Sequence, residues 1–101
     1  MRFLMKVSIP NEPFNSYIKD GSVGHRMQAI MGEIKPEAVY FTAVHGVRTA
    51  TLIVHFDDIA QMVHFAEPFF LQMNAEVEYH PVMLPEDLAR ANLEEMGKKW
   101  K

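Results

Sequence analysis

The sequence has no cysteine and only one tryptophan among its 101 residues. The absence of cysteine excludes a disulfide framework, a thiolate metal site and a cysteine nucleophile. It also fits a reducing compartment, so we expect a cytoplasmic protein. No apolar run approaches the roughly 18 residues that cross a bilayer, and the N-terminal segment has the pattern of a strand, not of a signal peptide. We therefore expect no membrane partner.

An excess of basic residues is also lacking. Ten Lys and Arg residues stand against 13 Asp and Glu residues, which gives a net charge of −3. Nucleic-acid-binding domains usually carry a basic patch, so we expect no nucleic-acid partner. Apolar residues make up 49% of the chain and charged residues 23%, the proportions of a folded globular protein. The length predicts one domain over residues 1–101.

Four segments alternate apolar and polar residues with the period of two that is typical of β-strands. The first covers residues 2–9. The next two cover about residues 38–44 and 47–56, and the His-Gly pair between them predicts a two-residue hairpin turn. The fourth, about residues 75–82, contains Pro81, which predicts either an edge strand or an end of the pairing at that residue.

Three segments repeat apolar residues at spacings of three and four, as amphipathic helices do. The first, about residues 11–35, is expected to break near Asp20-Gly21-Ser22, because its apolar residues otherwise lie on opposite faces. The second follows Asp57 or Asp58 and carries a wide apolar stripe, and Pro68 within it is expected to kink the helix or divide it near Ala66. The third begins at Pro85 and ends in a basic run, which complements the helix dipole.

This order, βαββαβ with an extra C-terminal helix, predicts an α+β ferredoxin-like fold with a four-stranded antiparallel sheet. Both crossover helices then cover one face, and the other face is uncovered. Strand alternation places Leu4, Tyr40 and Ile53 on that face, which makes it more apolar than a solvated face requires. We therefore expect two such faces to pack together as a homodimer around a lumen. The alternative is a solvated sheet face, because threonine is common on exposed strands.

Several polar residues could handle a small molecule. Histidine transfers protons near neutral pH, and a neighbouring carboxylate or lysine tunes it. A kink at Pro68 would turn the preceding glutamate toward a pocket. The candidate ligand-binding residues are Lys6, Tyr40, His55, Glu67, Glu78 and His80. The alternative interpretation is that they are ordinary interface and surface residues.

No motif in the sequence names a reaction. No two histidines are spaced as a helical pair, and no Glu-x-x-His element occurs, so we expect no metal site. The glycines do not form a phosphate loop, and no nucleophile elbow is present. We therefore assign no catalytic residue and expect no cofactor. Whether the chain is an enzyme stays open.

Four proline-containing segments are spread over nearly the whole chain, at residues 9–13, 35–41, 67–71 and 80–88. They resemble a family of small uncharacterised bacterial proteins that is similar to the dimeric α+β barrel superfamily. That superfamily includes antibiotic-biosynthesis monooxygenases, muconolactone isomerases, chlorite dismutases and haem-degrading enzymes. The resemblance implies a homodimer that binds a small, partly apolar molecule, with cofactor-independent monooxygenation or isomerisation as candidate chemistry. The alternative is a non-catalytic oligomerisation or protein-interaction module.

Overall fold

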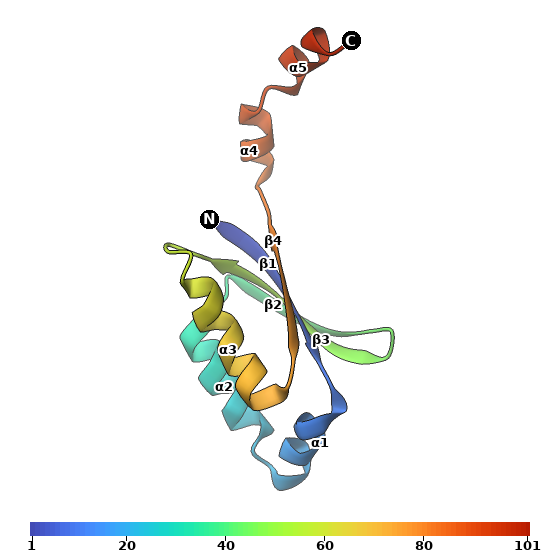
Figure 1. The fold of residues 1–101 in the computed structure, drawn as a ribbon, viewed down its shortest axis with the longest axis vertical. Helices are drawn as coiled ribbons and strands as arrows, with labels where there is room; N and C mark the ends of the chain where they lie inside the picture. The colour runs from blue at the N-terminus through green and yellow to red at the C-terminus, as the bar shows by residue number, and fades with distance from the viewer.

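Four strands and five helices follow one another in the computed structural model, which describes residues 1–101. Their order is β1 (Arg2–Ile9), α1 (Asn11–Asp20), α2 (Val23–Ile34), β2 (Ala38–Val44), β3 (Val47–His55), α3 (Gln61–Met73), β4 (Glu76–Pro81), α4 (Pro85–Arg90) and α5 (Leu93–Lys99). The strands form one antiparallel sheet in the order β2-β3-β1-β4. Helices α2 and α3 lie side by side over one face of this sheet (Figure 1). The predicted α+β ferredoxin-like fold is confirmed.

The β2–β3 hairpin has the predicted turn and register. His45 and Gly46 occupy the turn with φ of 51° and 77°, a left-handed conformation that glycine adopts without steric cost. Tyr40 pairs with Thr51 across the hairpin, as counting from this turn requires. At the other side of the sheet, β4 pairs only with β1. The proline-containing strand therefore lies at the sheet edge, where a missing backbone donor is tolerated.

The first helical region breaks where the sequence predicts. Gly21 has a φ of 81°, and its N–H donates to the carbonyl of Ile18. This left-handed glycine closes the C-terminus of α1 and lets α2 start in a new direction. The change of direction brings Phe14 of α1 and Ile30 of α2 to the same core.

The core lies between the inner face of the sheet and the helices α2 and α3. Strands β1 and β3 supply its floor through their alternate residues, and α3 supplies the largest side chain that is fully buried, Phe69. Burying each large side chain of this kind contributes roughly 1.5–3 kcal/mol. The floor consists of Phe3, Met5, Val7, Ile9, Ala50, Leu52 and Val54.

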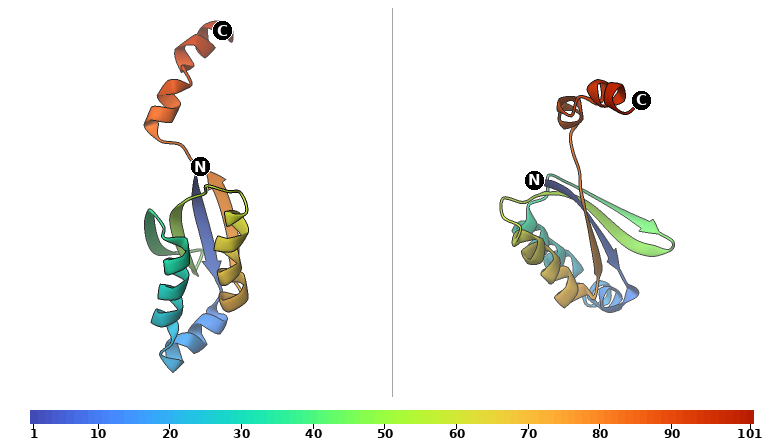
Figure 2. Two further views of the ribbon diagram at one scale, coloured as in Figure 1. Left: turned by 90° about the vertical axis from the view of Figure 1, so that its left-hand side faces the viewer. Right: turned by 45° about the horizontal axis from the view of Figure 1, so that its top comes forward.

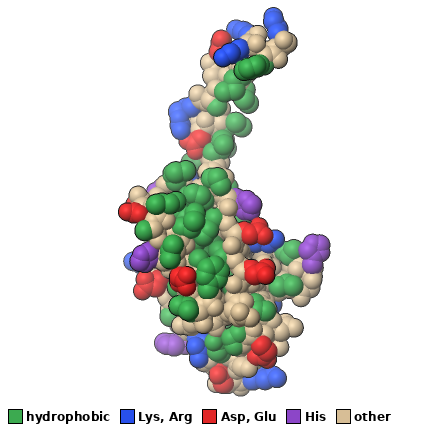
Figure 3. All heavy atoms as spheres, in the orientation of Figure 1, with side chains coloured by type: hydrophobic (Ala, Val, Ile, Leu, Met, Phe, Trp, Pro, Cys, Tyr) green, Lys and Arg blue, Asp and Glu red, His purple; other side chains and the backbone are tan.

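Helix α3 buries less of its apolar stripe than the sequence predicts. Met73 and Ala66 are buried, but Val63 and Phe70 are exposed, and Ile59 lies before the helix, which begins at Gln61. The reason is that α3 packs along the edge strand β4, so only one side of the stripe meets the sheet. Apolar side chains consequently gather on the outer surface over α3 (Figure 3). The helix continues through Pro68.

The C-terminal helix is divided in two. Asn92 has a φ of 56°, and this left-handed residue separates α4 from α5. Residues 83–101 form a C-terminal arm that projects beyond the sheet, and none of its residues is buried (Figures 1 and 2). The radius of gyration is 17.3 Å, whereas a compact chain of this length has about 13 Å. No helix of the structure is long and apolar enough to cross a membrane.

Candidate ligand-binding site

The uncovered face of the sheet presents side chains in rows that cross all four strands. One row comprises Tyr40, Thr51, Lys6 and Glu78, and the next comprises Ala38, Ile53, Leu4 and His80. His55, opposite Arg2, continues the same face, so the register places five of the predicted site residues on one face. Lys6 and Glu78 are direct neighbours, whereas Tyr40 lies two strands away from Lys6, on the edge strand β2.

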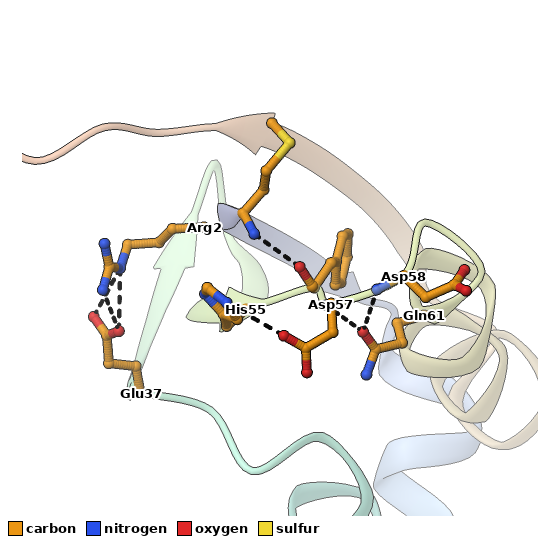
Figure 4. Close-up of polar contacts among 8 residues, drawn as sticks. Arg2, Glu37, His55, Asp57, Asp58 and Gln61 are labelled. Atoms are coloured by element: carbon orange, nitrogen blue, oxygen red, sulfur yellow. Dashed lines mark hydrogen bonds and ion pairs between the residues drawn. The ribbon is translucent and has the colours of Figure 1, made fainter. Parts of the chain in front are cut away.

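The histidines of this face have carboxylate neighbours on their own side of the sheet. His80 Nε2 lies 3.3 Å from an oxygen of Glu78, and both side chains are exposed. His55 lies at the end of β3, with its Nε2 3.6 Å from Asp57 Oδ1 (Figure 4). No group of three or more His, Cys, Asp or Glu side chains could hold a metal ion. Because the side chains of both histidine–carboxylate pairs are exposed, solvent screens these contacts.

Glu67 lies apart from the other predicted site residues. It belongs to α3, on the helical side of the sheet, and it borders a hollow of about 250 Å³ between α3 and β4. Tyr79 borders the same hollow, and its hydroxyl donates to the carbonyl of Met62 at 2.7 Å. Burial raises the pKa of Tyr79 to about 12, because the phenolate is less well solvated there. The structure thus does not bring Glu67 together with Lys6, Tyr40 or the histidines.

An apolar groove lies between α2 and the β2–β3 hairpin, on the inner side of the sheet. Its volume is about 370 Å³, within the range of small-molecule sites. The groove exists because β2 extends past the helices: Phe41 points to the inner face, yet its side chain is 62% exposed. Its lining residues are Ile9, Phe14, Val23, Gly24, Met27, Phe41, Thr42, Arg48 and Thr49.

Thr49 differs from its predicted environment. Strand alternation predicts that it shares the uncovered face, but the residue is only 2% exposed. It sits on the central strand β3 between Ser8 and Thr42, and its hydroxyl donates to the carbonyl of Val47 at 3.0 Å. The buried hydroxyl is therefore satisfied within its own strand.

Arg48 is the one charged residue that lines the groove. It pairs with Ile9 in the sheet register and so lies on the inner face. Its guanidinium carbon is 4.8 Å from the ring centroid of Phe14, a cation–π contact. Its Nη1 atom is buried and has no hydrogen-bond partner. A buried donor without a partner costs free energy, which marks this position as unusual.

The groove and Arg48 are absent from the sequence-based candidates. The signal that could have found Arg48 is strand parity, because the residue continues the inner-face series of Ala50, Leu52 and Val54. Charged residues are rarely found among buried apolar ones, so an arginine in this series is a candidate for a functional residue. The groove could not be found in this way, because it depends on how far β2 extends beyond α2.

Comparison with known proteins does not place the chain in a family. No protein-family model matches it, and no curated protein matches its sequence. The resemblance of its proline-containing segments to the dimeric α+β barrel superfamily therefore stays a prediction. The features of the structure that bear on function are the groove, the uncovered sheet face and the C-terminal arm.

Proposed function

We propose that this chain forms a homodimer of the dimeric α+β barrel type and binds a small, partly apolar molecule in the groove between α2 and the β2–β3 hairpin. The observation that carries the proposal is the groove itself, a largely apolar hollow of about 370 Å³. Protein interiors are normally close-packed, so a hollow of this size beside the core suits a ligand. Phe14, Met27 and Phe41 supply apolar contacts, and Arg48 supplies a polar one, the usual composition of such sites.

A groove-filling substitution tests this function. Gly24 lines the groove, and no atom lies within 4 Å of the position that a Cβ would take there. Gly24→Met therefore places a side chain in the open groove without a backbone clash. Gly32→Met is the matched control, since Gly32 lies on the same helix, has the same open space and does not line the groove.

The probe for this test is N-phenyl-1-naphthylamine, a neutral apolar dye that fluoresces when it is bound. We expect the wild-type chain and Gly32→Met to bind the dye, and Gly24→Met to lose binding. Both substitutions raise helix propensity by a similar amount, so a difference between them reports on the groove. Equal dye binding by all three proteins, or no binding by the wild type, contradicts the proposed site.

The homodimer is supported by two surfaces that a monomer leaves in water. Tyr40 is 68% exposed on the uncovered sheet face, which also carries Ile53 and Leu4. None of the residues of the C-terminal arm is buried. Its exposed apolar residues are Met83, Leu84, Leu88, Leu93, Met96 and Trp100. Exposed apolar surface of this extent is typical of interfaces, and self-association with two-fold symmetry is the commonest form.

Charge complementarity favours a second copy of this chain as the partner. The arm ends in Lys98, Lys99 and Lys101, and the edge strand β4 presents Glu76 and Glu78 on the uncovered face. Opposite charges on surfaces that meet guide association and register. In the proposed dimer the uncovered faces of two sheets meet, and each arm packs on the partner. His55, His80 and Lys6 then line the space between the sheets.

Within this proposal, the candidate chemistry is monooxygenation or isomerisation of the bound molecule without a cofactor. A second candidate function is a non-catalytic oligomerisation or protein-interaction module. The observation that favours the second candidate is the arm, which projects from the body and exposes Leu88, Leu93 and Trp100. The module predicts self-association without dye binding in the groove, so the Gly24→Met comparison separates the two functions.

A further inference from the structure

We propose that the groove selects ligands in which a carboxylate is attached to an apolar body, and that Arg48 binds the carboxylate. This inference rests on the proposed function, because it names the ligand class of the same groove. An aliphatic or aromatic carboxylic acid is the chemistry that fits. Three features of Arg48 lead to this assignment: its missing partner, its position and the shape of its charge.

The first feature is that Arg48 alone among the four arginines has no polar partner. Arg2 makes hydrogen bonds to the carboxylate of Glu37, Arg90 binds Asp87, and Arg26 donates to the hydroxyl of Ser22 at 3.0 Å. None of the ion pairs in the structure involves Arg48, and its Nη1 atom is buried without an acceptor. A ligand that brings an acceptor satisfies this donor.

The second feature is the position of Arg48 among apolar groups. It is the one charged residue of the groove, whose other walls include Ile9, Met27 and Phe41. A charge is stronger in apolar surroundings than in water, and so is the penalty for leaving it unpaired. A ligand that is apolar throughout still fills the groove but leaves the guanidinium unpaired, so it binds less tightly than a ligand with an anionic end. A ligand with an anionic end matches the groove along its whole length.

The third feature is the geometry of the guanidinium. The guanidinium carbon lies over the ring of Phe14, 4.8 Å from the ring centroid, which is a cation–π contact. This contact holds the group before any ligand arrives. A planar guanidinium presents two parallel N–H donors, which a carboxylate accepts as a pair. A planar carboxylate is therefore preferred to an alcohol or an amide of the same body.

The experiment measures calorimetric binding of octanoate and octanol to the full chain near neutral pH. These probes share an apolar body and differ in the carboxylate. We expect octanoate to bind wild type at least about tenfold more tightly, the range of a hydrogen bond to a charged group. Arg48→Met should abolish this preference. Arg48→Lys, which keeps the charge but not the paired donors, should reduce it.

The matched control is Arg26→Met. Arg26 also lies over an aromatic ring, that of Tyr17 at 3.9 Å, and its loss changes the net charge equally, but it does not line the groove. Arg26→Met should keep the preference for octanoate. If octanol and the naphthylamine dye bind and octanoate binds no more tightly than octanol, the carboxylate assignment is overturned and the proposed function stands. If neither octanoate, octanol nor the dye binds, both fall.

Discussion

At the scale of single residues, the guanidinium of Arg48 lies in surroundings that are energetically unfavourable for a polar group. Arg48 holds a buried, unpartnered donor beside an apolar ring, while the exposed arginines of the surface are paired. Most buried donors in native proteins have a partner, so a buried donor without one calls for an explanation. The conflict between local stability and a polar group in the groove is therefore the clearest residue-level sign of function.

A stability measurement tests this view of Arg48. Arg48→Met removes the unpartnered donor and keeps an apolar side chain of similar length, at the loss of a cation–π contact of about 0.5–1 kcal/mol. We expect the free energy of unfolding without ligand to stay the same or rise by up to about 2 kcal/mol. Urea unfolding followed by circular dichroism measures it. A loss of more than about 1 kcal/mol would assign Arg48 a structural role instead.

Tyr79 makes a second residue-level prediction, on pH dependence. Its raised pKa of about 12, against an ordinary 10, means that the folded state holds the phenolic proton more tightly than the unfolded state. The contribution to stability is complete below pH 10 and is lost as pH rises toward 12. Tyr79→Phe should make the free energy of unfolding less steep in this window. Urea unfolding across the window measures the slope.

The same variant tests the hydrogen bond of the Tyr79 hydroxyl. Tyr79→Phe should also lose about 1 kcal/mol at neutral pH, since the hydrogen bond to Met62 joins β4 to α3. An unchanged slope for Tyr79→Phe would contradict the burial of this hydroxyl.

At the scale of elements, the sequence predicts best those features that depend on residues close together in the chain. The His45-Gly46 turn and strand alternation together determine the hairpin register, and Gly21 determines the break between α1 and α2. Prediction is poorer where a distant neighbour decides. The exposed half of the α3 stripe depends on the placement of the sheet edge, and the groove depends on the reach of β2. The apolar residues that follow Pro85 are spaced regularly enough for one helix, but Asn92 separates α4 from α5.

The uncovered sheet face gives the element-level prediction. Ile53 lies in a central strand of this face, in the same row as Leu4 and His80. Ile53→Glu places a charge where two sheets meet in the proposed dimer, so we expect dissociation into monomers, measured by sedimentation velocity. Ile18→Glu is the control, since Ile18 is an exposed isoleucine of α1, outside the sheet. A dimer that survives Ile53→Glu would exclude this face as the interface.

At the scale of the whole molecule, the chain consists of a folded body and a projecting arm. The body has its own core, but the arm extends the longest dimension to 61 Å and buries nothing. Such an arm adds to stability only when another surface covers it. In the proposed dimer, the second copy covers one arm and its own arm covers the first copy, because a two-fold interface repeats every contact.

The arm makes the corresponding prediction. Leu93 is 57% exposed at the start of α5. Leu93→Glu should weaken the proposed dimer, raising its dissociation constant at least about tenfold, because it puts a charge into an apolar contact. Sedimentation equilibrium measures the constant, with Ile18→Glu again as the control. An unchanged constant would mean that the arm packs on something other than the partner.

The most direct test of the central claim, a homodimer that holds a small apolar molecule in each groove, is native mass spectrometry. The full chain is sprayed at low and high concentration, with and without N-phenyl-1-naphthylamine. We predict a species of twice 11.6 kDa at both concentrations, which takes up the dye in wild type and Gly32→Met but not in Gly24→Met. A monomer at both concentrations, or equal dye uptake by Gly24→Met, would contradict the account.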